Sequence, residues 1–285
     1  MHVEPADPVA LPRPVAFVLG GGGSLGAIQV GMLEALAERG IVPDLVVGTS
    51  VGAINGAVMA DDPDGAAERL AHAWAHFDAD RVFPRGVIGR VRTLHEHHNH
   101  LYLELGLAAL LAEHLPTGAT IEGGALPLRV VTTDVATGEP VVLASGPLLP
   151  ALMASAAVPG VFPPVERDGR LLYDGGLVAN VPVQQAVDAG ARSLVVLDCT
   201  FPGQPPIRPT TLLDAILFSA MVVLRQQTAA ALAAVPADVP VLQLPGPAPL
   251  PVSPLDFDHT LTLMDFAYDA ARAYLVGTGH PADAS

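Results

Sequence analysis

The sequence has a single cysteine and few charged residues, and both scarcities narrow the range of functions. One cysteine, Cys199, excludes an internal disulfide bond, and its place after an apolar run predicts a buried position at the end of a strand. Charged residues make up 15% of the chain, and acidic residues outnumber basic ones so far that the net charge is −15. This charge argues against nucleic acid as a partner and against permanent electrostatic attachment to an anionic bilayer.

The sequence also lacks a long apolar run. The longest one, Ala215–Leu224, is too short to span a bilayer and lies between Asp214 and Arg225. The first residues lack the basic and apolar regions of a secretory signal peptide. We therefore expect a soluble, cytoplasmic protein.

What the chain does contain is 285 residues, of which 51% are hydrophobic, enough for a sizeable core. Alternating strands and helices predict one α/β domain over 14–276, with a mostly parallel central sheet covered by helices on both faces. Residues 1–13 and 277–285 are expected to be a disordered lead and tail. Strands are predicted over 15–19, 45–49, 128–133, 140–144, 165–173, 193–198 and 239–244. Helices are predicted over 27–39, 53–60, 66–77, 102–114, 148–157, 181–189, 212–234 and 256–276.

Two glycine-rich turns near the N-terminus carry the strongest chemical signal. The first predicted strand ends in Gly20-Gly-Gly-Gly-Ser-Leu-Gly26, a loop whose backbone N–H groups are free to face an anion. The next strand ends in Gly48-Thr-Ser50-Val-Gly52, which has the G-x-S-x-G pattern of a nucleophile elbow. Ser50 is therefore the candidate nucleophile, and Gly48 and Gly52 are the small residues that its tight turn needs.

The first loop has a competing interpretation, because Gly21-x-Gly23-x-x-Gly26 also matches the dinucleotide fingerprint. That fingerprint requires an acidic residue at the end of the second strand. Here the strand ends in Gly48-Thr-Ser50, and the nearby Asp44 stands at its beginning. The sequence therefore favours the nucleophile over the dinucleotide site.

The histidines are scattered rather than arranged as a metal site. His72 and His76 are one helical turn apart, but no glutamate accompanies them in an H-E-x-x-H pattern, which favours an exposed helix face. Residues 81–100 are locally basic and rich in histidine. They are either a solvated loop or a mobile cap that touches an anionic surface or substrate.

A serine nucleophile needs a base, and the sequence offers two kinds. His259 comes late enough to complete a Ser, Asp, His order, but it lacks a surrounding signature. Asp174 ends a predicted strand and is followed by Gly175 and Gly176, which would let a buried carboxylate approach the hydroxyl directly. From the residues alone both bases stay open.

Several blocks in the same order resemble the patatin-like phospholipases. They are Gly20–Gly26, Gly48–Gly52, Ala154-Ser-Ala-Ala-Val-Pro-Gly-Val-Phe-Pro163 and Asp174-Gly-Gly-Leu-Val-Ala-Asn-Val-Pro182. The likeness covers roughly Val15 to Asp198. It implies a three-layer patatin-like fold and a Ser–Asp dyad in place of a triad.

The resemblance also implies the roles of the site residues. Ser50 would be acylated, Asp174 would act as general base, and the N–H groups of Gly21, Gly22 and Gly23 would hold the oxyanion. The reaction would be hydrolysis of fatty-acyl esters without a metal or organic cofactor. Its partner would be a lipid or another acyl ester, with room for a transient contact with a membrane surface.

One position departs from the family. Many relatives carry Arg or Lys where this chain has Leu25, which removes a cation beside the loop and weakens the case for an anionic phospholipid. Two further functions stay open: an esterase that uses His259, and a non-catalytic lipid- or acyl-binding protein on the same scaffold.

Overall fold

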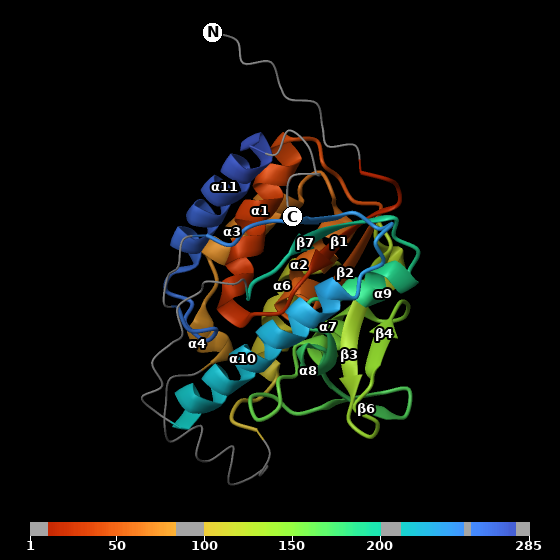
Figure 1. Cartoon of the computed structure of the whole chain (residues 1–285). Helices are drawn as coiled ribbons and strands as arrows, with labels where there is room; N and C mark the ends of the chain where they lie inside the picture. Colours follow the sequence, from red (N-terminus) through yellow and green to blue (C-terminus); the bar gives the residue numbers. More distant parts are fainter. Residues whose placement is uncertain (1–10, 84–99, 201–211, 248–251, 278–285) are drawn as a thin grey trace.

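The chain folds as a central sheet between two layers of helices (Figure 1). The computed structural model describes residues 11–83, 100–200, 212–247 and 252–277. Within these residues the sheet has eight strands in the order β5-β6-β3-β2-β1-β7-β8, with β4 also paired to β3. Parallel pairing joins β1 (Val15–Leu19), β2 (Leu45–Thr49), β3 (Leu128–Asp134), β7 (Ser193–Leu197) and β8 (Val241–Gln243). Antiparallel pairing adds β4 (Pro140–Leu143), β5 (Val165–Arg167) and β6 (Arg170–Asp174).

The central strands β1, β2 and β7 are buried on both faces because helices cover both. In β1, the side chains of Val15, Phe17 and Leu19 join the larger hydrophobic core, while those of Ala16 and Val18 join the smaller one on the other face. This alternation follows from the two-residue period of a strand. A fully buried parallel strand therefore appears in the sequence as a continuous apolar run.

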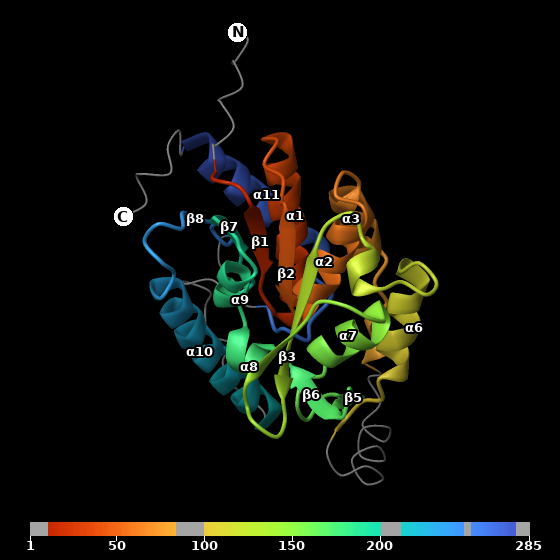
Figure 2. The ribbon, with the colours of Figure 1, turned by 90° about the vertical axis from the view of Figure 1, so that its right-hand side faces the viewer.

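Each face of the sheet has its own set of helices (Figure 2). The larger core lies under α1 (Ala27–Glu38), α2 (Val51–Asp61), α3 (Ala66–Ala75), α6 (Leu105–His114), α7 (Leu148–Ser155) and α11 (Thr260–Gly277). The smaller core lies under α8 (Gly176–Ala179), α9 (Val183–Asp188) and the C-terminal part of α10 (Leu212–Ala233). Three short elements complete the described chain: η1 (Gly23–Gly26), α4 (Ala79–Val82) and η2 (Ile121–Gly123).

The long helices α1 and α11 lie against each other, although they stand at opposite ends of the sequence (Figure 1). Gly31 makes this approach close, because a Cβ at that position would lie 2.1 Å from the carbonyl oxygen of Met264. The C-terminal helix is thereby fixed to the helix that follows the glycine-rich loop.

The structure confirms the predicted α/β class and the mostly parallel sheet with helices on both faces. The expected helix over 256–276 begins later, at Thr260, because residues before it form turns in which Asp258 N–H donates to Asp256 Oδ1. The short helices α4 and α8 were not expected. Most of the predicted lead, the tail and the basic stretch 81–100 lies outside the described residues.

Cys199 is fully buried after β7, as expected, and burial raises the pKa of its thiol. Among the described helices, none combines the length and the apolar character that crossing a membrane would require.

Candidate active site

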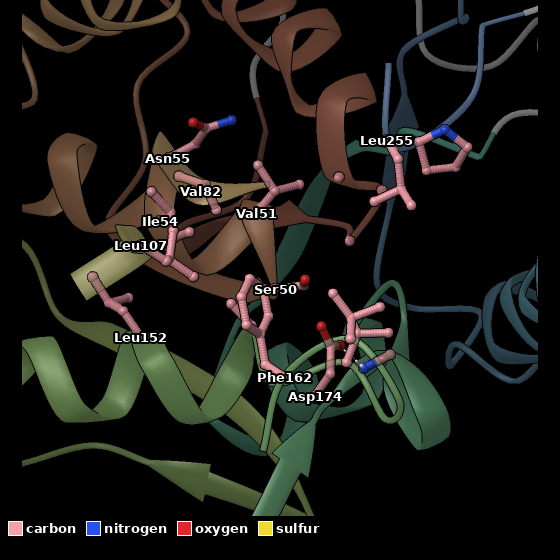
Figure 3. Close-up of a pocket in the computed structure, with 18 of the residues that line it drawn as sticks. Ser50, Val51, Ile54, Asn55, Val82, Leu107, Leu152, Phe162, Asp174 and Leu255 are labelled. Atoms are coloured by element: carbon pink, nitrogen blue, oxygen red, sulfur yellow. Dashed lines mark hydrogen bonds between the residues drawn. The ribbon is translucent and has the colours of Figure 1, made fainter. Parts of the chain in front are cut away.

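Ser50 and Asp174 meet because two strands end against each other along one edge of β3. β2 pairs with the first half of β3, where Thr49 lies opposite Val131. β6 pairs with the second half, where Asp174 lies opposite Thr132. Since β4 occupies the other edge over both halves, β2 and β6 share one edge and their C-terminal ends face each other. Ser50 follows Thr49 directly, and Figure 3 shows the Asp174 carboxyl group turned toward it.

The turn that carries Ser50 has the strained backbone of a nucleophile elbow. Ser50 has φ 55° and ψ −126°, in a region that residues other than glycine rarely occupy. α2 begins at the next residue. A Cβ added at Gly48 would lie 2.4 Å from the carbonyl oxygen of Gly52, and one added at Gly52 would lie 2.3 Å from that of Leu19. Glycine at both positions is what lets strand and helix approach this closely.

The C-terminal end of α7 holds both candidate catalytic residues in place. Ser155 Oγ accepts a hydrogen bond of 2.8 Å from the backbone N–H of Ser50 and donates one of 2.6 Å to the carbonyl oxygen of Val131. The backbone N–H of Asp174 donates to the carbonyl oxygen of Ala157 at 2.9 Å. One helix end therefore fixes the separation of the nucleophile from the carboxylate.

Asp174 is buried, and its surroundings suit a base. Its Oδ1 accepts the backbone N–H of Gly176 at 2.7 Å, while its Oδ2 has no hydrogen-bond partner among the described residues. Burial raises the pKa of Asp174 from its ordinary value of 3.8 to about 6, against the smaller lowering effects of the Ser50 hydroxyl and of the Gly176 N–H. A carboxylate with a free oxygen beside a serine hydroxyl can accept the proton of that hydroxyl.

The glycine-rich loop is packed on the other side of Ser50. A Cβ at Gly21 would lie 2.8 Å from Asn180 Oδ1 and 3.1 Å from Ser50 Cβ, so the loop passes between these two residues. The N–H of Gly21 donates to the carbonyl oxygen of Asn180 at 3.1 Å. A Cβ at Gly22 would lie 2.5 Å from Cys199 Cβ. Gly21 therefore uses its donor within the protein, unlike the expectation that all three glycines offer theirs to an anion.

The segment before α11 and the start of α2 pack against the C-terminal half of the glycine-rich loop. Gly23 has φ 59°, and a Cβ there would lie 2.2 Å from the carbonyl oxygen of Pro254. A Cβ at Gly26 would lie 2.4 Å from Val51, the first residue of α2. Among the described residues, no acceptor is found for the N–H groups of Gly22 and Gly23. These two groups are therefore the donors available to an anion at the N-terminal end of η1 and α1.

A buried polar network ties this loop to α2. Gln29 Nε2 donates to the carbonyl oxygen of Gly20 at 2.8 Å, and Gln29 Oε1 accepts from Asn55 Nδ2 at 2.8 Å. Asn55 Nδ2 also donates to the carbonyl oxygen of Gly26 at 3.0 Å, and Asn55 Oδ1 accepts from Trp74 Nε1 at 3.1 Å. Both ends of the loop are thus held by two side chains whose hydrogen bonds are satisfied.

An apolar cavity of about 300 Å³ adjoins Ser50 and Asp174 (Figure 3). Its walls come from α2, α3, α6 and α7, from part of α10 and from the segment before α11. Val51, Ile54 and Val58 repeat at helical spacing along one wall, which runs about 10 Å at 1.5 Å per residue. The few polar residues at the cavity include the two candidate catalytic residues and Asn180. The cavity suits a chain of methylene groups that is attached to a polar group near Ser50.

Other residues singled out in the sequence lie elsewhere. The His259 side chain is exposed, 3.7 Å from Asp256, and is not among the residues that line the cavity. Leu25 is fully buried in the larger core, so its apolar character serves packing rather than the site. The rings of His72 and His76 stack 4.3 Å apart. No cluster of metal-ligating side chains occurs in the part of the chain that the structure describes.

The two glycines after Asp174 have distinct structural reasons. A Cβ at Gly175 would lie 2.4 Å from the carbonyl oxygen of Val131, so this glycine lets β6 end directly against β3. Gly176 supplies the N–H that the carboxylate accepts. Both positions therefore serve the placement of the carboxylate.

Sequence reasoning missed residues that act through contacts far apart in the chain. Ser155 lies within the block Ala154–Pro163, where the sequence alone indicates no role for it. Gln29 and Asn55 look like ordinary polar residues of two helices. A signal was present, because both lie at positions where their helices are otherwise apolar. Phe257, which lines the cavity from the C-terminal third, had no local signal.

A family model and several known proteins match the sequence. A sequence model described as patatin-like phospholipase matches residues 17–187. The chain is 35% identical over 187 residues to patatin-like phospholipase domain-containing protein ZK370.4 of Caenorhabditis elegans, an alignment that covers 65% of this chain and 13% of that protein. It is 32% identical over 195 residues to lysophospholipase nte1 of Aspergillus terreus, covering 65% and 12%. The chain thus spans only about an eighth of the length of these relatives.

Two solved structures also align with the chain. Human GIVD cytosolic phospholipase A2 in complex with methyl gamma-linolenyl fluorophosphonate aligns with a TM-score of 0.45 and 14% identity, covering 98% of this chain and 60% of that one. VipD from Legionella pneumophila aligns with a TM-score of 0.44 and 15% identity, covering 93% and 67%.

Proposed function

The chain belongs to the patatin-like phospholipase family, and on that premise we propose that it is a lipid acyl hydrolase with Ser50 as nucleophile and Asp174 as general base. The observation that carries the proposal is the meeting of these residues beside a long apolar cavity. An acyl chain in the cavity would place its ester carbonyl at the serine, which suits fatty-acyl esters.

The proposed reaction has two halves. Ser50 Oγ attacks the ester carbonyl carbon while its proton passes to Asp174, and the carbonyl oxygen becomes an oxyanion. When the oxyanion re-forms the carbonyl group, the bond to the leaving alkoxide breaks, and Asp174 gives its proton to the alkoxide oxygen. Water then attacks the acyl-enzyme with Asp174 again as base, which releases the fatty acid and restores Ser50. No metal or organic cofactor takes part in these steps.

We assign the oxyanion to the N–H groups of Gly22 and Gly23, because the N–H of Gly21 already donates to Asn180. Such donors act on charge that develops in the transition state, and the loss of one typically costs about 10²–10³ in kcat. Gly21 instead supports the loop next to Ser50. A transient contact with a membrane surface stays a prediction that the lipid nature of the substrate would explain.

Labelling with a small fluorophosphonate tests the proposal. The activated Ser50 Oγ should displace fluoride from phosphorus, so intact-mass analysis should show one adduct on the wild type, mapped to Ser50. Release of fatty acid from a monoacyl phospholipid and from a neutral monoacyl ester, measured in parallel, would identify the head group. If the folded wild type takes up no label and releases no fatty acid but still binds these lipids, the lipid-binding alternative replaces the proposal.

Substitution of Gln29 by methionine should impair the loop without unfolding the protein. The variant loses the hydrogen bonds from Gln29 Nε2 to the carbonyl oxygens of Gly20 and Leu197, 2.8 and 3.0 Å long, and the bond that Gln29 Oε1 accepts from Asn55 Nδ2. The loop is therefore held less firmly against β7 and α2. Misplacement of a catalytic group by about 1 Å can cost 10²-fold. We therefore expect kcat to fall on the order of 10²-fold, with a smaller change in KM.

A matched control for this variant is available in Ser193. Its buried hydroxyl donates to the carbonyl oxygen of Pro12 at 2.7 Å, at the start of β7 and thus at the opposite end of the strand from the loop. Ser193→Ala should lose stability and keep its kcat. Equal losses of kcat in the two variants would show that Gln29 contributes only to general stability.

A further inference from the structure

The cavity has one wall that the family comparison does not cover. Residues 17–187 match the family, whereas Ala220, Met221 and Leu224 of α10 and the segment Pro254–Phe257 line the cavity from beyond that range. The candidate catalytic residues therefore come from the part of the chain that matches the family, and part of the cavity wall comes from residues after it. Residues that tune the accepted acyl chain can be sought in the second group.

Phe257 occupies the centre of an aromatic cluster that joins this wall to residues of the matched range. Its ring centroid lies 4.5 Å from that of Phe77, 5.6 Å from that of Phe83 and 6.3 Å from that of Trp74. All three pairs are stacked, with interplanar angles between 17° and 23°. Phe83 in turn lies 5.7 Å from Phe162, which also lines the cavity. The rings form a continuous side of the cavity.

The row of aromatic rings begins near the catalytic residues. Phe162 N–H donates to the carbonyl oxygen of Val158, and Ala157 just before it accepts the N–H of Asp174. Phe257 is separated from Phe162 by the ring of Phe83. An acyl chain that is bound through its carbonyl at Ser50 and follows this row of rings from Phe162 would reach Phe257 after Phe83.

The backbone before Phe257 is fixed to the glycine-rich loop. Ser24 N–H donates to the carbonyl oxygen of Pro254 at 2.8 Å, and Ser24 Oγ donates to that of Ser253 at 2.9 Å. These bonds use only backbone acceptors of the segment, so they do not depend on the Phe257 side chain. The backbone three residues before Phe257 is therefore held at the glycine-rich loop.

We infer that Phe257 is a specificity-determining residue that favours acyl chains long enough to reach it. The ring is half-buried, with cavity on one side and solvent reachable on the other. It therefore supplies apolar contact to the later methylenes and separates them from water. This inference rests on the proposed acyl hydrolase function.

The test is a chain-length profile of kcat/KM for p-nitrophenyl esters from acetate to palmitate, in the wild type and in Phe257→Ala. One methylene in an apolar pocket changes kcat/KM by about tenfold or more. We expect Phe257→Ala to lose at least about tenfold for the long esters and to keep the wild-type values for acetate and butyrate. Phe257→Leu should lie between the two.

Two controls separate this inference from the proposed function. Phe266→Ala removes a ring of α11 that is 41% exposed and does not line the cavity, and should leave the profile unchanged. The small fluorophosphonate, which has no long chain, should label Phe257→Ala as fast as the wild type. A wild type that is not labelled overturns the proposed function. If Phe257→Ala is labelled but loses the same factor in kcat/KM at every chain length, or loses nothing at any chain length, the role of Phe257 is overturned.

Discussion

Asp174→Asn is expected to lower kcat by at least about a thousandfold in a protein that stays folded. The amide can still accept the N–H of Gly176, but it cannot take the proton of Ser50. General base catalysis is typically worth about 10²–10⁴-fold, and this carboxylate would act in both halves of the reaction. The measurement is turnover of a neutral acyl ester together with circular dichroism. Retention of more than a tenth of the activity would rule out Asp174 as the base.

The same residue sets the expected pH dependence of the wild type. The base works only when it is deprotonated, and burial places the pKa of Asp174 at about 6. We therefore expect kcat/KM to rise with pH through about 6 and to level off above it. Asp198 is a suitable control, because burial also raises its pKa while its carboxylate accepts hydrogen bonds from Thr200. Asp198→Asn should keep the midpoint of the activity profile.

The stability of the folded protein should fall as the pH rises through about 6, whereas the activity should increase. The folded-state pKa of Asp174 is above the unfolded value, so the folded state holds this proton more tightly between pH 3.8 and about 6. That stabilisation is complete below pH 3.8 and is lost as the pH rises through about 6. Each pKa unit corresponds to about 1.4 kcal/mol, so the loss is on the order of 3 kcal/mol. Asp174→Asn should therefore be more stable than the wild type at pH 8, by urea unfolding, and little different near pH 4.

The sequence predicts the parts of the site that depend on local pattern. β1 and β2 were predicted with the bounds that the structure has, because a parallel strand buried on both faces is a continuous apolar run that ends in glycine. The elbow at Ser50 could be predicted for the same reason: a strand, two glycines and a helix lie within a few residues. Such features need no knowledge of the distant chain.

The meeting of Ser50 with Asp174 depends on register and could not be derived from local pattern. It requires that β2 and β6 share one edge of β3 and stop at Val131 and Thr132, which only the pairing of distant strands decides. The resemblance to a family supplied the pair without this geometry. The hydrogen bond from Gly21 to Asn180 is similar, because it joins residues far apart in the chain.

The cavity could not be predicted from the sequence. Its walls come from helices separated by most of the chain, and each helix alone looks like ordinary core. The position of Phe257 depends on turns before α11, where a longer helix had been expected. The sequence shows that such residues are apolar, but their periodicity does not tell whether they pack in the core or line a cavity.

Replacement of Ser50 should separate catalysis from backbone strain. Ser50→Ala and Ser50→Gly both remove the nucleophile, so both should lose acyl hydrolysis and fluorophosphonate labelling completely. Only glycine also relieves the strain at φ 55° and ψ −126°, which typically costs about 1–3 kcal/mol for other residues. Part of the gain is offset by the larger conformational entropy of glycine in the unfolded chain.

We therefore expect Ser50→Gly to unfold at higher urea than the wild type, by about 1 kcal/mol, and Ser50→Ala to remain close to the wild type. Asp168→Gly is the matched control, since Asp168 has φ 50° on the exposed turn between β5 and β6. It should gain stability and keep full turnover. If Ser50→Gly were no more stable than Ser50→Ala, the elbow would hold no strain that glycine relieves, and the serine would be kept there at no cost to the fold.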